Sequence, residues 1–478
     1  MERDDLHREV YRTQGKLTSC FGYDAMGRKA WQYASTLPAD KLSQVHNTGI
    51  NTSLLVEHAY NPIHRRYQYD PAGELVRTLD KLRGEIKYEY EANGQLRSRD
   101  TGSLVGSEEF RYDAAANRLD FNARQFAKFR DNRITHWRDQ EYRYDPWGNL
   151  IEKYSGHSKL QHFTYDCENR LVRAETYVSG KLESTGQYRY DSLGRRVAKQ
   201  AEINGEVEHK RFLWQGLRML REETPGQSIL YLYEPGSYAP LARVDQTEGE
   251  EQKLYYFHTD QIGTPLELTD SDGTIVWQAT YRSWGTVEHL AVSEVEQNLR
   301  FQGQYFDGET GLHYNTFRFY ESEVGRFITQ DPIGLEGGFN LYLYAPSPIL
   351  WLDPMGLATY STMPGIEGFQ KHHIIPQQLV DHPVLKASGM NIHALNNIIY
   401  LPTHEEFHPM RTIHRGSHPG YNRDVKVSLN EVEKIGRQEK WTQAQYKAAV
   451  DDIISDNRQG LRKGQIKLNK NSIRGGAC

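Results

Sequence analysis

The sequence predicts a mainly β protein that ends in a small α+β domain. Aromatic residues make up 12% of the 478 residues, and 31 of them are Tyr, a composition typical of β-strands. An aromatic-x-Tyr-Asp unit recurs along the first part of the chain. The last quarter lacks this repeat, and eight of the 19 histidines lie in it. A chain of this length is also expected to form at least two structural units.

The repeated unit reads aromatic-x-Tyr-Asp, then two or three residues, then Gly or Asn. Alternating aromatic residues predict a strand, Asp opens a turn, and Gly or Asn takes the left-handed position before the return strand. One such hairpin cannot bury its apolar face alone, so neighbouring hairpins are expected to stack into a continuous sheet. We interpret nearly all of these repeats as scaffold. The clearest copies are Phe21–Arg28, Tyr67–Gly73, Tyr88–Gly94, Tyr142–Gly148 and Tyr188–Arg195.

The last quarter of the chain is basic, whereas the rest is acidic. From residue 358 to the end, 16 Lys and Arg face 11 Asp and Glu, while the remainder has 42 against 52. This asymmetry suggests a region that meets a polyanion, although a slightly basic globular domain fits the charge equally well. Two amphipathic stretches, about 428–439 and 442–457, predict helices in this region.

The composition argues against several classes of protein. The three cysteines, Cys20, Cys167 and Cys478, form no Cys-x-x-Cys pair, so neither a disulfide framework nor a cysteine-based zinc site is indicated. The N-terminus lacks the apolar stretch of a signal peptide, and no run of about 18 apolar residues could span a bilayer. We therefore expect a chain that is made in the cytoplasm and contains no membrane span.

A block of sequence, Asp-Pro-x-Gly-Leu, occurs twice, at Asp331–Leu335 and at Asp353–Leu357. Each block by itself predicts a tight turn, because Asp accepts local N–H groups, Pro fixes φ and Gly supplies a positive φ. The second copy coincides with the change in composition, so the pair marks a domain boundary. From the residues alone, two turns with Asp caps are the simpler interpretation.

These features resemble the YD-repeat (tyrosine–aspartate) proteins of the Rhs family. The resemblance covers about three quarters of the chain, and it implies that residues 1–325 form a β-shell of hairpins coiled into a hollow cocoon around a C-terminal toxin. The N-terminal membrane and spike segments of many members are not present, so a fragment or a small member of the family is expected. Besides the repeats, the motifs that carry the likeness are Phe257–Pro265, Tyr281–Gly285, Arg300–Asn315 and Gly325–Phe327.

The resemblance also gives a role to the paired blocks. It implies that residues 326–357 form the end of the shell and direct self-cleavage between Leu357 and Ala358. Asp331 and Asp353 would form a pair like that of aspartic proteases, in which one carboxyl keeps its proton and the other activates water. Arg326 is expected to tune this pair.

The histidines of the last quarter are ordered along the chain. His372 and His373 end a predicted strand, a second strand follows Asn397, and His414 and His418 are spaced to share one face of a helical turn. Two strands followed by a helix predict a ββα-metal arrangement. His372, His414 and His418 would supply three nitrogen ligands to a divalent ion and leave open positions for water and phosphate. His373, on the other face of the strand, would serve as general base.

This pattern resembles the HNH/endonuclease VII superfamily, and within it the AHH group of toxin nucleases. Lys371 stands where the group's name has Ala. The resemblance implies that residues 358–478 form a metal-dependent endonuclease that uses Zn or Mg and acts on nucleic acid, DNA in preference to RNA. The matching pieces are His372–Ile375, Asn397–Pro402 and His414–Tyr421.

Other residues receive supporting roles in this interpretation. Asn397 would hold the loop between the strands or orient the general base. Arg411 and Arg415 would assist at the phosphate, and Lys463 in the basic C-terminal segment would contact the nucleic-acid backbone. A solvated basic surface is the simpler alternative for Lys463.

Two alternatives from other classes remain open. His404-Glu405-x-x-His408 matches the zinc protease signature, but Pro402 and Pro409 leave little room for the helix that this motif needs. Four histidines are therefore interpreted as surface or substrate-contacting residues: His404, His408, His382 and His393. The chain could also be a non-enzymatic YD-repeat surface or adhesion protein.

The family resemblance implies a cellular setting as well. An Rhs-type antibacterial toxin is expected to be delivered into a target cell by type VI or similar secretion machinery and to act in the target cytoplasm. Because such a nuclease threatens its own producer, a cognate immunity protein is expected as a partner.

Overall fold

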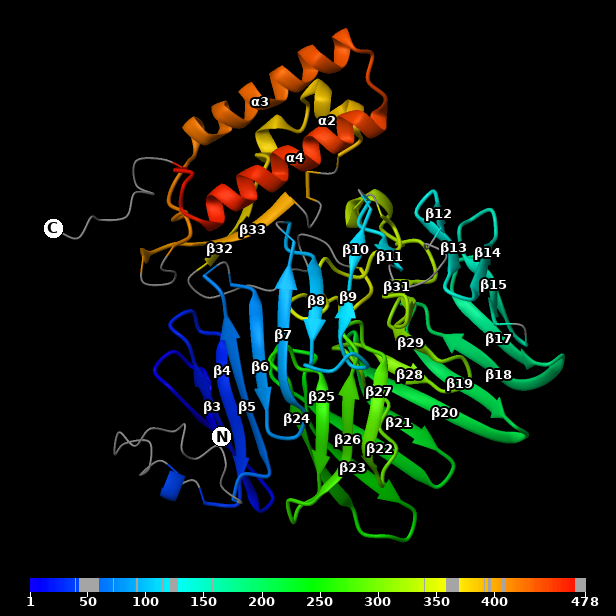
Figure 1. Ribbon diagram of the computed structural model, residues 1–478. Helices are drawn as coiled ribbons and strands as arrows, with labels where there is room; N and C mark the ends of the chain where they lie inside the picture. The colour runs from blue at the N-terminus through cyan, green and yellow to red at the C-terminus, as the bar shows by residue number, and fades with distance from the viewer. Residues whose placement is uncertain are drawn as a thin grey trace.

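The computed structural model describes residues 1–38, 40–42, 60–71, 73–91, 93–113, 115–120, 128–156, 158–338, 340–357, 369–390, 392–393, 397–405 and 410–468. Within these residues, strands dominate the chain as far as residue 327, and the long helices lie near the C-terminal end (Figure 1). The predicted fold class, mainly β with a small C-terminal α+β domain, is confirmed. None of the described helices is long and apolar enough to span a membrane.

The first long sheet is a meander in which each strand pairs antiparallel with the next along the chain. Sequential pairing is what a row of hairpins must give, since each turn joins neighbouring strands. Its nine strands are β1 (Glu2–Arg3), β2 (Glu9–Gln14), β3 (Leu17–Tyr23), β4 (Lys29–Ser35), β5 (Ile63–Tyr69), β6 (Leu75–Asp80), β7 (Gly84–Tyr90), β8 (Leu96–Asp100) and β9 (Glu108–Glu109). A separate pair follows, β10 (Arg111–Tyr112) and β11 (Arg118–Leu119).

The second long sheet continues the same plan over sixteen strands. They are β12 (Lys128–Arg130), β13 (Arg133–Trp137), β14 (Gln140–Tyr144), β15 (Leu150–Ser155), β16 (Lys159–Tyr165), β17 (Leu171–Val178), β18 (Lys181–Tyr190), β19 (Arg196–Ile203), β20 (Glu206–Gln215), β21 (Arg218–Thr224), β22 (Gln227–Tyr233), β23 (Pro240–Thr247), β24 (Lys253–Thr259), β25 (Pro265–Thr269), β26 (Ile275–Tyr281) and β27 (Val287–Ser293). A four-stranded sheet completes the shell: β28 (Tyr305–Asp307), β29 (Leu312–Asn315), β30 (Arg318–Glu321) and β31 (Arg326–Phe327).

The turns of the repeat have the predicted chemistry. After Tyr144, the backbone N–H of Gly148 donates to the Asp145 carbonyl at 3.1 Å, and Asp145 Oδ1 accepts from the N–H of Asn149 at 2.9 Å. Gly148 has φ +86°, in the left-handed region where Gly is favoured. The Asp and the Gly of each unit therefore build the turn locally.

The structure also explains why the repeat uses Tyr before Asp. In most of the described copies, the hydroxyl of this Tyr donates to a backbone carbonyl at or next to the first residue of an earlier strand, at 2.6–3.1 Å. Phe could fill the same space but could not make this bond, which ties one hairpin to another. The donors are Tyr23, Tyr69, Tyr90, Tyr112, Tyr165, Tyr190 and Tyr233.

The four-stranded sheet packs against the inner face of the sixteen-stranded sheet. Asp307 is fully buried there and pairs with Arg196 at 2.5 Å and with Lys199 at 3.0 Å. Because buried charge is costly unless it is paired, these ion pairs fix how the two sheets meet. The apolar core between the sheets contains Trp137, Tyr142, Phe163 and Tyr188 from one side and Leu312, Tyr314 and Phe319 from the other.

The C-terminal domain has a core of its own, formed by side chains between residues 374 and 468. Both expected helices are present, but the first begins nine residues earlier than predicted, at Pro419, which is a favoured residue in a first helical turn. The elements are β32 (Phe369–His373), paired antiparallel with β33 (Ile398–Pro402), the 3₁₀ turn η3 (Gln377–Leu379), and the helices α2 (Pro383–Ser388), α3 (Pro419–Gln438) and α4 (Gln443–Arg462).

The position of this domain differs from the expected enclosure. Figure 1 shows α2, α3, α4 and the β32–β33 pair lying across one end of the sheets, beside β6–β8, and outside the curve of the shell. Its contact with the shell includes an ion pair between Arg462 and Glu74 at 2.5 Å. The four-stranded sheet, and not this domain, covers the inner face of the sixteen-stranded sheet.

Candidate metal centre and the paired aspartates

Three histidines converge at the end of the β32–β33 pair. The His372 ring lies 5.1 Å from the His414 ring and 5.3 Å from the His418 ring, measured between centroids. Ring nitrogens of His414 and His418 approach to 3.1 Å. One nitrogen from each of the three side chains lies within 4.8 Å of the others, which is close enough for a single metal ion to bind all three.

The chain brings these side chains together through a loop, not through a helix. The backbone N–H of His414 donates to the Pro402 carbonyl at 2.7 Å, which ties the loop to the end of β33. His418 is the residue immediately before α3, with Pro419 in the first helical turn. The expectation that His414 and His418 share a helical face is therefore wrong in its geometry, although the two side chains do meet.

The donor set suits a divalent ion. His372 is buried, and no described residue forms a hydrogen bond with its Nε2 atom. Burial, and then the neighbouring His414 and His418, lower the pKa of His372 to about 2, and burial lowers the pKa of His414 to about 4. Neutral imidazole is the form that binds a metal, and three imidazole nitrogens around one point suit Zn²⁺ better than Mg²⁺, which prefers oxygen ligands.

His373 forms a second histidine contact beside this cluster. Its Nε2 lies 3.0 Å from His393 Nδ1, and burial, followed by His393, lowers the pKa of His373 to about 4. His373 is therefore neutral at physiological pH, as a proton acceptor must be. His393 had been interpreted as a surface or substrate-contacting residue, and the structure places it against the predicted general base.

Asn397 is fully buried and holds the loop between the two strands. Its Oδ1 accepts from the N–H of Ile375 at 2.7 Å, while its Nδ2 donates to the carbonyls of Ile375 at 3.0 Å and Ile392 at 2.8 Å. Of the two predicted roles, this geometry favours the loop-holding one, because the amide bonds only to backbone on either side of α2.

We expect Asn397→Ala to destabilise the C-terminal domain by about 3 kcal/mol, because three buried backbone groups lose their partner. Chemical denaturation followed by far-UV circular dichroism measures this change. Asn422→Ala is the matched control, since Asn422 donates at the surface to Gln378 at 2.9 Å, and it should change stability by less than about 0.5 kcal/mol. Equal losses in the two variants would contradict the assigned role.

The predicted phosphate-binding residues lie in different surroundings. Arg411 is half-buried, donates to the Tyr400 carbonyl at 2.9 Å and faces Gly73 of the shell, so it lies at the interface between the two domains. Arg415 is exposed and donates to the Thr403 carbonyl at 2.8 Å. Lys463 is exposed at the end of α4.

The zinc protease motif is described only in part. His404 lies in a bend, with its Nδ1 3.1 Å from the Thr403 hydroxyl, and Glu405 follows it. Residues 406–409, His408 among them, lie outside the described residues.

A second cluster joins the two Asp-Pro-x-Gly-Leu blocks. Asp331 and Asp353 are both buried, and Arg318 lies between them, 2.9 Å from Asp331 Oδ2 and 3.5 Å from Asp353 Oδ2. Arg326 lies elsewhere and donates to Asn132 and Asn117. The arginine at the acid pair is thus Arg318, which the sequence analysis missed.

Both blocks form the predicted turns. The N–H of Gly334 donates to the Asp331 carbonyl at 2.9 Å, and the N–H of Leu357 donates to Asp353 Oδ1 at 2.8 Å. Arg318 also donates to the carbonyl of Gly356, next to the predicted cleavage site. Burial raises the pKa of Asp331 although Arg318 opposes the shift. Ala358 lies outside the described residues.

Comparison with known families identifies both parts of the chain. The Teneurin YD-shell family model matches residues 74–340, more than half of the chain. The chain belongs to the Rhs/YD-shell family of polymorphic toxins. Residues 354–456 match a second model, "a nuclease family of the HNH/ENDO VII superfamily with conserved AHH", so this Rhs/YD-shell protein carries a C-terminal AHH nuclease domain.

Curated relatives of this Rhs/YD-shell protein differ in their named activities. It is 43% identical over 382 residues to "Double-stranded DNA deaminase toxin A" of Burkholderia cenocepacia (strain H111), covering 75% of this chain and 26% of the relative. It is 30% identical over 312 residues to "Probable deoxyribonuclease RhsA" of Dickeya dadantii (strain 3937), covering 63% of this chain and 21% of the relative. The chain therefore spans about a quarter of the length of these relatives.

The solved structures support the shell fold of the family. The crystal structure of a TcdB2-TccC3 complex matches 74% of this Rhs/YD-shell chain and 19% of that chain, with a TM-score of 0.50 and 18% identity. At this identity the likeness concerns the fold alone. The activity must therefore be argued from the histidines and aspartates described above.

Proposed function

We propose that the AHH domain is a metal-dependent endonuclease that hydrolyses phosphodiester bonds of nucleic acid, DNA in preference to RNA. The observation that carries this proposal is the convergence of His372, His414 and His418 beside the His373–His393 pair in a domain that matches the AHH family. The preference for DNA is supported by the name of the Dickeya dadantii relative, a probable deoxyribonuclease.

The histidines of the site have two different roles in this proposal. His372, His414 and His418 would hold the divalent ion, which supplies Lewis-acid stabilisation of the charge that builds on the phosphodiester oxygens. His373 accepts the proton of the attacking water, and His393 holds the imidazole of His373 in place through the 3.0 Å contact. Arg415, exposed in the loop between His414 and His418, is available to a phosphate group.

Removal of metal is expected to abolish this activity. The chain is incubated with supercoiled plasmid and, separately, with a structured RNA, before and after treatment with EDTA. We expect nicking of plasmid by the untreated protein, loss of at least about 10²-fold of the rate after chelation, and recovery when Zn²⁺ or Mg²⁺ is restored. Activity that survives chelation would contradict the metal centre, and cleavage of RNA alone would reverse the substrate preference.

We also propose that the shell cuts its own chain between Leu357 and Ala358. The cluster of Asp331, Arg318 and Asp353 supports this second activity, because it places two buried carboxyls and a cation beside the predicted scissile bond. Since burial raises the pKa of Asp331, we assign the retained proton to it and the role of base to Asp353.

In this reaction, water attacks the Leu357 carbonyl carbon and gives one proton to Asp353. Asp331 donates a hydrogen bond to the carbonyl oxygen, and Arg318 stabilises the negative charge that develops there. The C–N bond then breaks, and the proton passes to the amine of Ala358. The products are a carboxylate at Leu357 and a free amino group at Ala358.

The cellular role of the whole protein is a further part of this proposal. The relative from Burkholderia cenocepacia is named a toxin, which supports delivery of the AHH domain to a target cell. Type VI or similar secretion machinery would carry it, and a cognate immunity protein would protect the producer. Enclosure of the AHH domain would then require parts of a longer shell, because this chain covers about a quarter of its relatives.

A further inference from the structure

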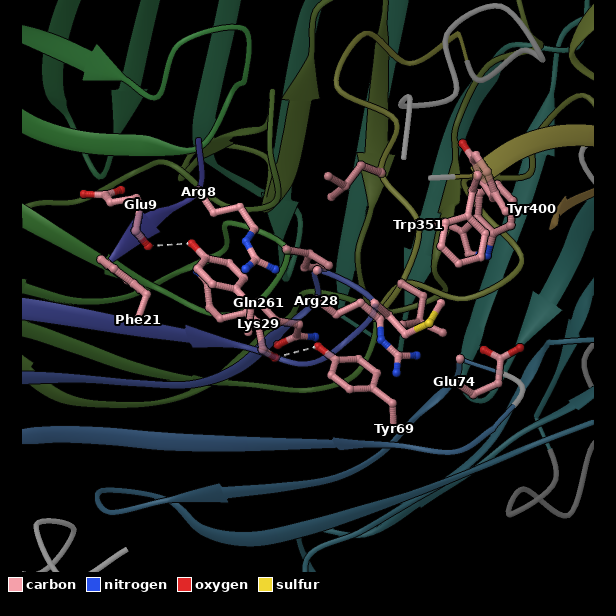
Figure 2. Close-up of a pocket in the computed structure, with 18 of the residues that line it drawn as sticks. Arg8, Glu9, Phe21, Arg28, Lys29, Tyr69, Glu74, Gln261, Trp351 and Tyr400 are labelled. Atoms are coloured by element: carbon pink, nitrogen blue, oxygen red, sulfur yellow. Dashed lines mark hydrogen bonds between the residues drawn. The ribbon is translucent and has the colours of Figure 1, made fainter. Parts of the chain in front are cut away.

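A cavity of about 590 Å³ lies between the shell and the AHH domain. Seven cationic side chains and three carboxylates line it, so its walls are basic. Figure 2 shows Arg8, Arg28 and Lys29 on the shell side of this cavity, with Trp351 and Tyr400 at its other end. It does not include the three histidines of the metal centre or the paired aspartates, and neither proposed reaction uses it.

The charge is concentrated where the two domains meet. Arg411, Arg458 and Arg462 of the AHH domain face the shell, and Arg462 pairs with Glu74 at 2.5 Å. Burial, and then the charge of Arg462, lower the pKa of Arg411 and of Arg458 to about 9, while Glu74 of the shell acts in the opposite direction on both. Three guanidinium groups thus lie around Glu74 at this end of the cavity.

This arrangement brings three positive charges together in a partly buried place, where each opposes the charge of the others. Burying a charge is costly unless it is paired and hydrogen-bonded. Within the part of the chain that the structure describes, the buried Nε of Arg462 has no hydrogen-bond acceptor. An anion in the cavity would reduce the repulsion between the three positive charges and supply an acceptor to this atom.

The remaining walls offer flat aromatic surfaces. Tyr69, Trp351 and Tyr400 line the cavity, and the Arg28 guanidinium lies over the Tyr69 ring at 4.2 Å. Aromatic and guanidinium planes are the surfaces on which nucleobases stack. The volume also lies within the range of sites for small molecules.

We propose that this cavity binds a mononucleotide, with its phosphate on Arg411, Arg458 and Arg462 and its base against the aromatic wall. A guanidinium group can donate two parallel hydrogen bonds to two oxygens of a phosphate. The single carboxylate of Glu74 has too few oxygens to bond to three arginines in this way. The ligand contacts both domains, so it binds the docked arrangement and holds the AHH domain on the shell. A mononucleotide contains no phosphodiester bond, so it is not a substrate of the proposed endonuclease, and its binding here would be independent of that activity.

The binding site is tested by isothermal titration calorimetry of the full chain with AMP, inorganic phosphate and adenosine. We expect AMP to bind, inorganic phosphate to bind at least about tenfold more weakly, and adenosine not to bind at millimolar concentration. AMP should also raise the Tm of the full chain, because it binds the folded, docked state. No heat with millimolar AMP, or equal binding of adenosine, would overturn the proposal.

Two substitutions with opposite expected effects test the charge argument. Arg462→Gln should weaken AMP binding by at least about tenfold, and Glu74→Gln should strengthen it by about tenfold, because a competing negative charge is removed. Arg143→Gln is the matched control, since Arg143 pairs with Glu152 at 3.1 Å on the outer surface, and it should leave affinity unchanged. Circular dichroism confirms that each variant is folded. A loss of affinity in both cavity variants would mean that these residues only hold the domains together, and would overturn the site.

Discussion

Asp353→Asn is expected to leave the protein as one intact chain of 55.4 kDa, whereas we expect the unmodified protein to yield a fragment that begins at Ala358. The amide of Asn still accepts the N–H of Leu357, so the turn is kept, but it cannot take a proton from water. We expect the rate of cleavage to fall by on the order of 10²–10⁴-fold. Denaturing gel electrophoresis and intact mass measurement, with N-terminal sequencing of the smaller fragment, follow the reaction over time.

Asp145→Asn is the matched control for this experiment. Asp145 opens a similar turn in the repeat, where its Oδ1 accepts from Asn149, but it lies outside the Asp331–Arg318–Asp353 cluster. Cleavage should proceed at the normal rate in this control, and Arg318→Gln should be slow. Normal cleavage in Asp353→Asn would refute the proposed acid pair and leave both blocks as turns.

The hairpins and turns could be predicted because their determinants are local. Asp145 and Gly148 form a complete turn within a few residues, and any chain with this pattern would do the same. Arg318 could not be found this way, because its carboxylate partners come from two distant blocks and meet only in the folded sheet. Its one local signal is a charged residue inside an aromatic run between Tyr314 and Tyr320. Arg326 had the same residue type but a different position in space.

For the candidate metal centre, the sequence predicted which residues come together but not the backbone structure that brings them together. The order of His372, His414 and His418 along the chain was enough to group them, since three imidazoles around a strand pair suit a divalent ion. The spacing of His414 and His418 also fits one helical face, and this suggested the wrong backbone. In the structure α3 begins only at Pro419, and the loop is held instead by a bond from His414 to Pro402.

The position of the AHH domain depends on contacts that no local pattern contains. Arg411 was assigned to the nucleic acid because it is basic and close in sequence to His414. It lies half-buried against Gly73 of the shell, in a group of arginines around Glu74. A basic residue can serve a phosphate or a domain interface, and only the neighbours in the fold distinguish these two uses.

His373→Ala is expected to slow nicking of plasmid by on the order of 10²–10⁴-fold while the three other histidines still bind a metal ion. The physical reason is that, in the proposed mechanism, His373 accepts the proton of water, whereas His372, His414 and His418 hold the metal. Initial rates of nicking measure the first effect. Metal bound per chain, measured by inductively coupled plasma mass spectrometry after dialysis, measures the second.

His404→Ala is the control that also tests the zinc protease alternative. In that alternative His404 is a metal ligand and the protein does not nick plasmid, so His404→Ala should lose the bound metal and His373→Ala should keep it. If the histidines act as we propose, His404→Ala nicks plasmid within about twofold of the unmodified rate, because its side chain contacts the Thr403 hydroxyl in an exposed bend. Loss of bound metal in His404→Ala, with no nicking of plasmid by the unmodified protein, would reverse the assignment, because each variant removes one imidazole from the same domain and only its position differs.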